Sequence, residues 1–295
     1  MTALYKSWKN LSLEKREREY SPSSCIGGDY RPFLAAYSTL SRQSYKDAVV
    51  AGGEWRRLSY GTSMSQGIDI CIPKLGVVAA KTSLMIFIHG GYWQELAAAD
   101  SHFAAAGCIS HGYAFAAIDY TLAPYATVAD IVQECRAAVR YVMQHADELG
   151  IDATRIVLAG SSAGAHLAAM ASEDESSYPN TIHACVLVSG IYDLQPLVGT
   201  SINDALGLTS ESAATASPMF RKLNNFPKHI VICYGDNETA EFKRQSDDFF
   251  GLLSHAGLNC ISFEIPNRNH FDVIFDLSND QTSLGKHTLA LLTLT

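Results

Sequence analysis

Residues 155–171 read RIVLAGSSAGAHLAAMA, in which a short apolar run passes through two serines into an alanine-rich segment. The apolar run predicts a buried strand, and the alanines predict a helix. Between them, residues 160–164 (GSSAG) match the G-x-S-x-G pattern of a nucleophile elbow, whose turn is too tight for Cβ atoms beside the serine. Ser162 is therefore the predicted nucleophile, at a helix N-terminus that favours negative charge. An ordinary glycine-flanked turn is the alternative.

The same alternation of strand and helix continues on both sides of this turn. From the third apolar run onward, strands alternate with helical patterns, which is typical of a mostly parallel sheet with helices on both faces. The first two strands are close enough for an antiparallel hairpin. We therefore expect an α/β protein with a mostly parallel, eight-stranded sheet. The predicted strands are 54–60, 67–73, 83–89, 113–120, 155–160, 183–190, 229–235 and 260–266, and the predicted helices are 96–110, 127–149, 163–173, 240–256 and 281–293.

A single domain is expected over residues 1–295, with two segments that interrupt the strand pattern. Residues 1–50 contain a charged helical stretch at 12–19 and no strand signal. They are predicted to form an N-terminal helical extension that could fold over the site as a lid. Residues 191–228 form a long excursion between two strands and are predicted to be a cap-like insertion. In α/β proteins such insertions lie at the C-terminal ends of strands, where substrate sites form.

The stretch IFIHGGYWQ, residues 86–94, ends an apolar strand on two glycines. A serine nucleophile creates a tetrahedral oxyanion, which needs N–H donors from a preformed site. Ala163, the residue after the nucleophile, is expected to give one donor. Gly90 and Gly91 are expected to give the others, because bare backbone can approach a substrate closely. His89 is expected to be a structural residue bonded to this loop.

A histidine and a carboxylate complete the predicted catalytic triad, in the chain order serine, acid, histidine. His270 follows the last predicted strand and Asp236 follows the strand before it, so both lie at the same sheet edge as Ser162. His270 is the predicted general base, and Asp236 is the predicted acid that orients it. The competing acids are Glu238, two residues further on, and Asp193. Either of these could instead serve turn geometry or solvation.

The aromatic pair Tyr92 and Trp93 directly follows the oxyanion loop. Aromatic side chains usually pack in a core, but a pair in this position is predicted to line the substrate pocket beside Ser162. Further candidates rest on loop position or charge alone. They are Tyr192, Phe220 and Phe271 for an aromatic wall, and Arg31, Arg221 and Arg268 for binding a substrate carboxylate.

Composition narrows the class of protein. The formal net charge is −8 with no long run of lysine and arginine, which argues against nucleic acid or an acidic membrane as main partner. The seven cysteines are scattered singly without CxxC or CxH spacing, so a reduced protein with no metal and no cofactor is expected. The N-terminal stretch lacks the apolar core of a signal peptide, and no run approaches the ~18 apolar residues of a membrane span. We therefore expect a cytoplasmic location.

With these residues in hand, the chain resembles the kynurenine formamidases (arylformamidases) of the α/β-hydrolase fold. The resemblance implies that fold for the whole chain and Ser162, Asp236 and His270 as the triad. The chain departs from the family at Ser161, where histidine is common, and we expect this to affect packing beneath the elbow rather than the proton relay. The matching segments are EREYSPSSC (17–25), HGGYWQ (89–94), SSAGAHLAAM (161–170), LVSGIYDLQPL (187–197), AEFKRQSDDF (240–249) and NHFDVI (269–274).

The resemblance also implies an activity, namely a serine hydrolase that cleaves an N-formyl arylamine. The leading substrate is N-formyl-L-kynurenine, which would give kynurenine and formate in tryptophan catabolism. A carboxylesterase for small or aryl esters and a deformylase of another catabolic pathway stay open, whereas a catalytically dead receptor is disfavoured because all the site residues are present. The expected partner is a small aryl formamide or ester, without nucleic acid or membrane, and a homodimer is left open.

Overall fold

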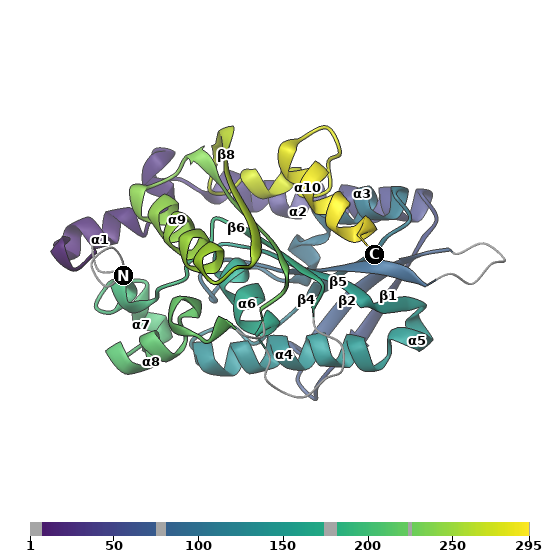
Figure 1. Ribbon diagram of the computed structural model, residues 1–295, viewed down its shortest axis with the longest axis horizontal. Helices are drawn as coiled ribbons and strands as arrows, with labels where there is room; N and C mark the ends of the chain where they lie inside the picture. Colours follow the sequence, from purple (N-terminus) through teal and green to yellow (C-terminus); the bar gives the residue numbers. More distant parts are fainter. Residues whose placement is uncertain (1–7, 75–80, 174–181, 224–225, 295) are drawn as a thin grey trace.

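One eight-stranded sheet organises the computed structural model, which describes residues 8–74, 81–173, 182–223 and 226–294 (Figure 1). The strands are β1 (Gly53–Ser59), β2 (Gly67–Pro73), β3 (Thr82–Ile88), β4 (Ala114–Ile118), β5 (Ile151–Ser161), β6 (Ala184–Val188), β7 (His229–Asn237) and β8 (Asn259–Asn269). Their spatial order is β1-β2-β4-β3-β5-β6-β7-β8. The pairs β1/β2 and β2/β4 are antiparallel, and the other neighbouring strands are parallel.

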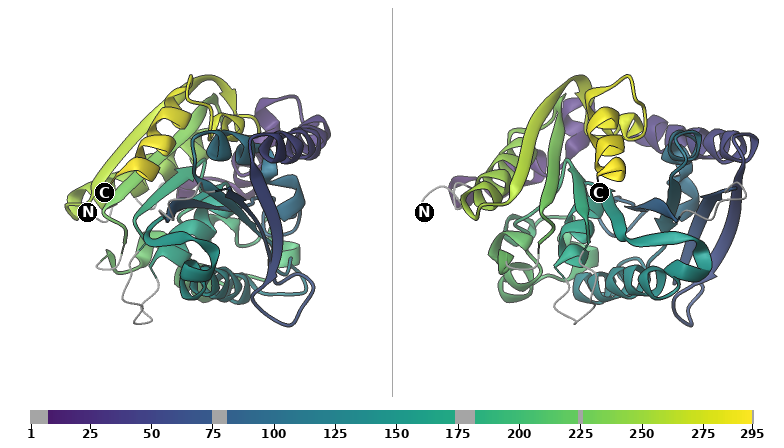
Figure 2. Two further views of the ribbon diagram at one scale, coloured as in Figure 1. Left: turned by 90° about the vertical axis from the view of Figure 1, so that its right-hand side faces the viewer. Right: turned by 45° about the vertical axis from the view of Figure 1, so that its right-hand side comes forward.

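Helices cover both faces of this sheet (Figure 2). They are α1 (Leu13–Glu19), α2 (Arg31–Val50), α3 (Ala105–Ser110), α4 (Val128–Gln144), α5 (Ala146–Leu149), α6 (Ala163–Ser172), α7 (Asn203–Leu206), α8 (Ser210–Thr215), α9 (Ala240–His255) and α10 (Ser283–Thr293). Within the described ranges, no helix is both long enough and apolar enough to cross a membrane.

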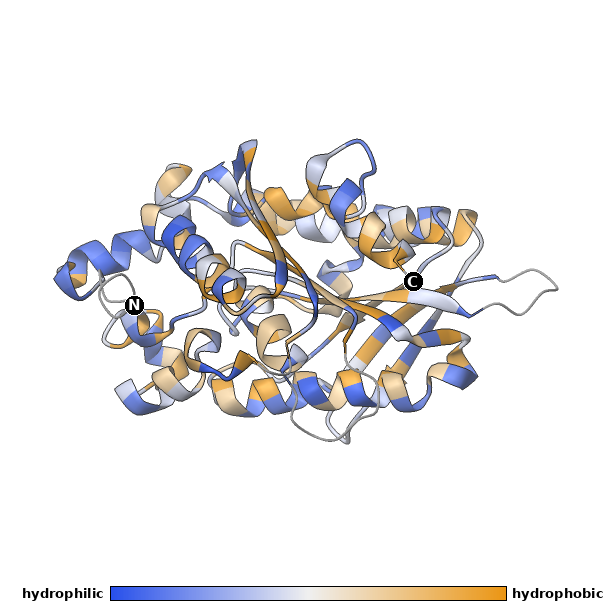
Figure 3. Cartoon of the chain, viewed as in Figure 1, coloured by the Kyte–Doolittle hydropathy of each residue, from blue (hydrophilic) through white to orange (hydrophobic). Residues whose placement is uncertain are grey.

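Two hydrophobic cores lie on the two sides of the sheet. Along β3, Leu84 and Ile86 belong to one core and Met85 and Phe87 to the other, as the two-residue repeat of a strand requires. Buried residues of α4, α6 and α9 complete the first core, and those of α2, α3 and α10 complete the second. Figure 3 shows hydrophobic residues concentrated in the strands, with hydrophilic residues on the outer surfaces of the helices.

The predicted α/β architecture is confirmed, since each of the eight predicted strands forms and the first two make the expected antiparallel hairpin. The helix predicted over 96–110 is shorter than expected. Only Ala105–Ser110 is α-helical, and it follows two 3₁₀ turns at Ala98–Asp100 and His102–Ala104. The helix predicted over residues 127–149 is divided at His145 into α4 and α5.

Helix α2 was predicted only as part of the N-terminal helical extension and without bounds of its own, although it is 20 residues long. Its buried positions are Tyr37, Ser41, Ser44 and Ala48, a narrow stripe at helical spacing. Two of these four residues are serines, so the buried face carries little hydrophobic signal. Ser44 instead accepts a hydrogen bond from the backbone N–H of Ala106 at 2.9 Å, which ties α2 to α3.

Helix α1 of the N-terminal extension lies beside α7 of the inserted segment, near the C-terminal edge of the sheet (Figure 1). The guanidinium of Arg16 in α1 donates to the carbonyl oxygens of Pro196 and Val198 at 2.9 and 2.8 Å. Tyr20, just after α1, is fully buried, and its hydroxyl donates to Glu241 Oε2 in α9 at 2.8 Å. The extension is thus fixed to the sheet layer at both α9 and the inserted segment.

Backbone packs directly on backbone where α6 meets the end of β3. A Cβ atom on Gly164 would lie 2.0 Å from the carbonyl oxygen of Ile88 and 2.7 Å from the carbonyl carbon of His89. Real Cβ atoms do not approach backbone this closely, so a side chain at position 164 would push the elbow helix away from the sheet.

We therefore expect Gly164→Ala to lower the free energy of unfolding by about 3 kcal/mol. Gly251→Ala in α9 is the matched control, because a Cβ there meets nothing within 4 Å and alanine stabilises a helix interior by about 0.5–1 kcal/mol. Urea unfolding midpoints of the two variants measure the difference. Equal midpoints would show that the backbone contact at Gly164 is not a constraint.

Candidate active site

Ser162 occupies the tight turn between β5 and α6, as the sequence predicts. Its backbone has φ 57° and ψ −122°, a conformation that is strained for a residue with a Cβ. The Ser162 N–H donates to the carbonyl oxygen of Val188, at the end of β6, at 2.9 Å. The neighbouring sheet therefore holds the strained residue in place, and its side chain faces a cavity.

The glycines after β3 lie directly against this elbow. A Cβ on Gly90 would be 2.7 Å from the carbonyl oxygen of Ser161 and 3.3 Å from the Cβ of Ser162, so only glycine fits there. Gly91 has φ +85°, which also favours glycine. Both glycines lie beyond the last paired residue of β3, and Ala163 is the first residue of α6. Their three N–H groups are therefore used neither by the sheet ladder nor within the helix.

Tyr120, which was not among the predicted site residues, fixes the orientation of the glycine loop. Its hydroxyl donates to the carbonyl oxygens of His89 at 2.9 Å and Gly90 at 3.2 Å. In a trans peptide the carbonyl and the following N–H point in opposite directions, so the N–H groups of Gly90 and Gly91 are directed away from Tyr120. The position of Tyr120 in the sequence is the signal that could have indicated this role. Tyr120 follows β4, and the last residue of β4 pairs with the last residue of β3.

His89 is a buried support of the same loop, as predicted. Its ring stacks on Tyr120 with centroids 4.2 Å apart, and its Nδ1 lies 3.1 Å from the carbonyl oxygen of Gly90. Burial lowers the pKa of His89, which favours the neutral imidazole. A neutral ring that stacks on Tyr120 and whose Nε2 is buried without a hydrogen-bond partner in the described part of the chain suits packing better than proton transfer.

His270 follows β8 and forms a buried pair with Glu238. Its Nδ1 lies 2.8 Å from Glu238 Oε2, which leaves Nε2 as the ring nitrogen available to a proton acceptor or donor. The other carboxylate oxygen of Glu238 accepts from the Ser189 hydroxyl and from the Gly235 N–H, each at 2.6 Å. The side chain of Glu238 is fully buried, so these three contacts fix both the carboxylate and the histidine.

The prediction that Asp236 orients His270 is corrected by this geometry. Asp236 is exposed, and its two carboxylate oxygens accept the backbone N–H groups of Asn267 at 2.9 Å and Arg268 at 3.2 Å. These backbone hydrogen bonds, led by that from Asn267, lower the pKa of Asp236. The β7/β8 register shifts at this point, and the extra β8 residues wrap around the Asp236 side chain. Asp236 is a turn carboxylate, and Glu238, its predicted competitor, is the partner of His270.

Asp193, the other competing acid, lies in a different network. Its Oδ2 accepts from the indole N–H of Trp8 at 3.1 Å, and its Oδ1 accepts from the backbone N–H of Gln195 at 2.9 Å. Burial raises the pKa of Asp193. This carboxylate therefore serves the contact between the N-terminal extension and the inserted segment.

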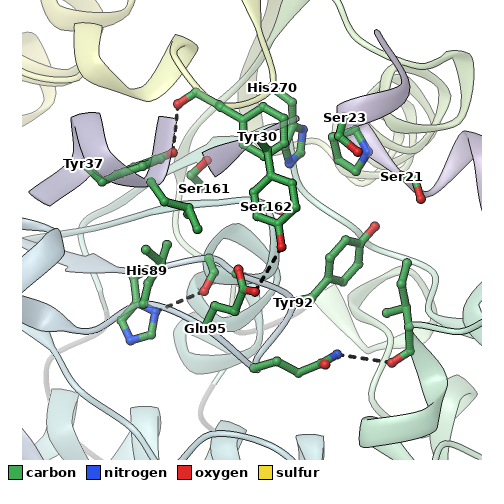
Figure 4. A pocket seen from close by; sticks show the side chains of 18 of the residues that line it. Ser21, Ser23, Tyr30, Tyr37, His89, Tyr92, Glu95, Ser161, Ser162 and His270 are labelled. Carbon is green, nitrogen blue, oxygen red and sulfur yellow. Dashed lines mark hydrogen bonds between the residues drawn. The ribbon is translucent and has the colours of Figure 1, made fainter. Parts of the chain in front are cut away.

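A cavity of about 330 Å³ opens in front of Ser162 and His270 (Figure 4). Residues of the N-terminal extension form one wall of it, and a lid function of residues 1–50 stays a prediction. The loop after β3 forms a second wall, and Ser201 and Ile202 come from the 191–228 segment. The lining includes the aromatic residues Tyr20, Tyr30, Tyr37, Phe87, Tyr92 and Phe271.

Trp93 does not line this cavity, contrary to the prediction, whereas Tyr92 does. Tyr92 and Trp93 have φ of 49° and 60°, and this left-handed backbone turns the chain back on itself. Trp93 is consequently fully buried, edge-on to His166 of α6 with ring centroids 5.1 Å apart. The Tyr92 hydroxyl donates to the Tyr20 carbonyl oxygen at 2.5 Å and so joins the pocket loop to the N-terminal extension.

The other candidates for the pocket wall divide in the same way. Phe271 lines the cavity and stacks on Tyr30 with centroids 5.8 Å apart, whereas Tyr192 is buried against Phe249 and Phe220 is exposed.

The three candidate arginines lie outside the lining, and each is paired with a carboxylate. The pairs are Arg31 with Asp29, Arg221 with Glu173, and Arg268 with Asp276. No group of three or more His, Cys, Asp or Glu side chains in the described ranges could hold a metal ion.

A family model described as BD-FAE matches residues 68–223, which include the elbow. The chain is 31% identical to the kynurenine formamidase of Salmo salar, over 97% of this chain and 98% of the relative. It is also 31% identical to the kynurenine formamidase of Danio rerio, with 97% and 98% of the two chains covered. The chain belongs to the kynurenine formamidase family. The resemblance inferred from short sequence segments is thus confirmed over nearly the whole length.

Esterases are also among the similar proteins. The esterase LipC of Mycobacterium tuberculosis is 24% identical over 80% of this chain and 64% of its own length. A solved structure of a candidate thioesterase from Silicibacter sp. is 25% identical, with a TM-score of 0.77 over 94% of this chain and 98% of that one. These similarities confirm the α/β-hydrolase fold and place the chain among hydrolases of amide and ester bonds.

Ser161 is the position where the chain departs from the residue common in this family. We expected the change to affect packing beneath the elbow, but Ser161 is part of the cavity lining. Its carbonyl oxygen is also the atom that excludes a side chain at Gly90. The departure therefore changes the pocket surface beside the nucleophile.

Replacing the buried carboxylate tests the corrected assignment. We expect Glu238→Gln to lower kcat about a thousandfold, because the amide no longer stabilises an imidazolium at His270. We expect Asp236→Asn to change kcat by less than about twofold, since its exposed side chain holds only the β8 turn. Steady-state hydrolysis of an aryl acetate measures both variants, and the opposite order of losses would restore Asp236.

Removing the Tyr120 hydroxyl tests the control of the glycine loop. We expect Tyr120→Phe to lower kcat about tenfold with little change in KM, because the loop N–H groups act on the transition state. Tyr60→Phe is the matched control, since its hydroxyl donates to the Asp119 carbonyl oxygen at 2.7 Å and Tyr60 lies outside the cavity lining. Equal kcat losses in the two variants would indicate a general effect of losing a hydroxyl.

Proposed function

We propose that this protein is a serine hydrolase that releases formate from an N-formyl arylamine, with N-formyl-L-kynurenine as its leading substrate. One observation carries the proposal. Ser162, the His270–Glu238 pair and the two loop glycines meet at a single cavity with aromatic walls. Membership of the kynurenine formamidase family, at 31% identity over 97% of the chain, supports the choice of substrate.

The proposed reaction begins with proton transfer from Ser162 to Nε2 of His270. The serine oxygen attacks the formyl carbon, while Glu238 stabilises the imidazolium through its contact with Nδ1. The N–H groups of Gly90, Gly91 and Ala163 supply the oxyanion hole for the tetrahedral intermediate.

Collapse of this intermediate requires a proton on the leaving nitrogen. Nε2 of His270 returns its proton to the aniline nitrogen, the C–N bond breaks and a formyl ester of Ser162 remains. A water molecule, deprotonated by the same nitrogen, then hydrolyses the ester and releases formate. The aryl leaving group fits against Tyr30 and Phe271, which takes the place of the Trp93 contact expected from the sequence.

A carboxylesterase for aryl or small esters is the second candidate, because the esterase relatives share this fold and a serine relay acts on both bonds. Cleavage of an ester depends less on protonation of the leaving group than cleavage of an amide does. Relative rates on the two substrate classes therefore separate the functions. A deformylase of another catabolic pathway remains a variant of the first candidate, with a different aryl group.

A cytoplasmic location is proposed on the state of the cysteines. All seven cysteines are free, and five of them are buried in the cores. Such usage is typical of a compartment that keeps thiols reduced.

We expect kcat/KM for N-formyl-L-kynurenine to exceed that for p-nitrophenyl acetate, because the family and the aromatic pocket favour the formamide. Ser162→Ala is the blank and should abolish both activities. Parallel steady-state assays measure the ratio. Rapid ester hydrolysis with negligible formate release would support the esterase and overturn the formamidase.

A further inference from the structure

The cavity lining is poor in positive charge. Among the described residues that line it, none is a lysine or an arginine, and Glu95 is the one carboxylate. The protein as a whole carries a formal net charge of −8. N-formyl-L-kynurenine carries both an ammonium and a carboxylate at neutral pH, and this lining offers an ionic partner only to the ammonium.

Glu95 is held close to the oxyanion loop by its backbone. Its N–H donates to the carbonyl oxygen of Gly91 at 3.0 Å, so the three residues between Glu95 and the second loop glycine lie within one closed turn. A Cβ at Gly91 would lie 2.6 Å from the Glu95 carbonyl oxygen, which shows how tightly this turn is packed. The position of the carboxylate relative to the reacting carbonyl is therefore set by the same turn that forms the oxyanion hole.

The side chain of Glu95 is partly engaged across the cavity mouth. The Tyr30 hydroxyl donates to Oε1 at 3.1 Å, and Figure 4 shows the two side chains pointing toward each other. Tyr30 stacks on Phe271, so its ring belongs to the aromatic wall assigned to the leaving group. Oε2 accepts no hydrogen bond from the described part of the chain and is open to a donor from solvent or ligand.

The nearest candidate cation does not neutralise this carboxylate. Arg31 follows Tyr30, but its guanidinium donates to both carboxylate oxygens of Asp29 at 2.7 and 3.0 Å. Its side chain is 82% exposed and lies outside the lining. Among the described lining residues, Glu95 therefore carries a negative charge at the mouth of the pocket that is not paired with a lysine or an arginine.

We propose that Glu95 is a specificity residue that binds an amino group on the aryl leaving group, so that the site prefers cationic aryl formamides and does not depend on a substrate carboxylate. The inference rests on the proposed function, because it assigns the leaving group to this side of the pocket. The ammonium would donate to Glu95 while the ring lies against Tyr30 and the formyl carbon reaches Ser162.

Four ortho-acylformanilides that share the reacting group and differ in the charged groups of the acyl side chain test this assignment. They are N-formyl-L-kynurenine, its decarboxylated amine, its deaminated acid and neutral ortho-acetylformanilide. In the unmodified protein, kcat/KM for the amine is expected to equal or exceed that for N-formyl-L-kynurenine, and the acid is expected to be the poorest substrate. A preference for the acid over the amine would overturn the proposal.

Glu95→Gln removes the charge and keeps an acceptor for the Tyr30 hydroxyl. We expect this variant to reduce the ratio of kcat/KM for amine over acid by about three- to tenfold, the range of a partly exposed ion pair. Glu148→Gln makes the same change of net charge on exposed α5 and should leave the ratio unchanged. An unchanged ratio in Glu95→Gln, or an equal change in both variants, would contradict a specific role for Glu95.

Tyr30→Phe separates the charge of Glu95 from its contact with the N-terminal extension. It removes the hydroxyl but leaves the carboxylate, so the preference for the amine should persist. If the preference disappears in Tyr30→Phe and persists in Glu95→Gln, the wall rather than the charge selects the substrate, and the proposal fails.

Failure of the proposed function is distinguishable from failure of this inference. If the unmodified protein hydrolyses aryl acetates but none of the four formanilides, the formamidase function is wrong. Phenyl acetates that carry an ammonium or a carboxylate then replace the formanilides. The same loss of cation preference in Glu95→Gln would still support the charge selection, and no loss would reject it.

Discussion

The direct contact between the backbone after β3 and the elbow before α6 is the constraint on which the site depends. At Gly90 and Gly164, a single methyl group would meet backbone atoms at 2.7 and 2.0 Å. Because no side chain separates these segments, the loop N–H groups and the Ser162 side chain occupy the same small region. The strained backbone of Ser162 is tolerated there because β6 holds it through a hydrogen bond to Val188.

The proton relay depends on the order of the strands in the sheet. Since β5, β6, β7 and β8 are adjacent and parallel, their C-terminal ends bring Ser162, Ser189, Glu238 and His270 to one edge. Glu238 is desolvated, and its hydrogen bonds to Ser189 and Gly235 compensate for the loss of water. The N-terminal extension and the inserted segment then border the cavity at this edge, with Tyr20, Tyr30 and Tyr37 coming from the extension, and the loop after β3 supplies the acidic Glu95.

The fold was predictable because central strands such as β3, β4 and β6 are buried on both faces and therefore appear as continuous apolar runs. Ser162, the loop glycines and His270 were predictable because each directly follows such a run. The bounds of helix α2 were not predicted, since two of its four buried positions are serines. The choice between Asp236 and Glu238 depended on the bulge of β8, and the burial of Trp93 depended on two left-handed residues. Neither feature leaves a periodic signal in the sequence.

The central claim is that the buried Glu238 carboxylate, and not Asp236, holds His270 through Nδ1. Proton NMR of the resting protein in water tests it most directly, because an imidazole N–H bonded to a buried carboxylate resonates far downfield of the amide protons. We expect this resonance in the unmodified protein and in Asp236→Asn, and we expect it to be absent in Glu238→Gln. A resonance that survives in Glu238→Gln and disappears in Asp236→Asn would show that Asp236 holds the histidine.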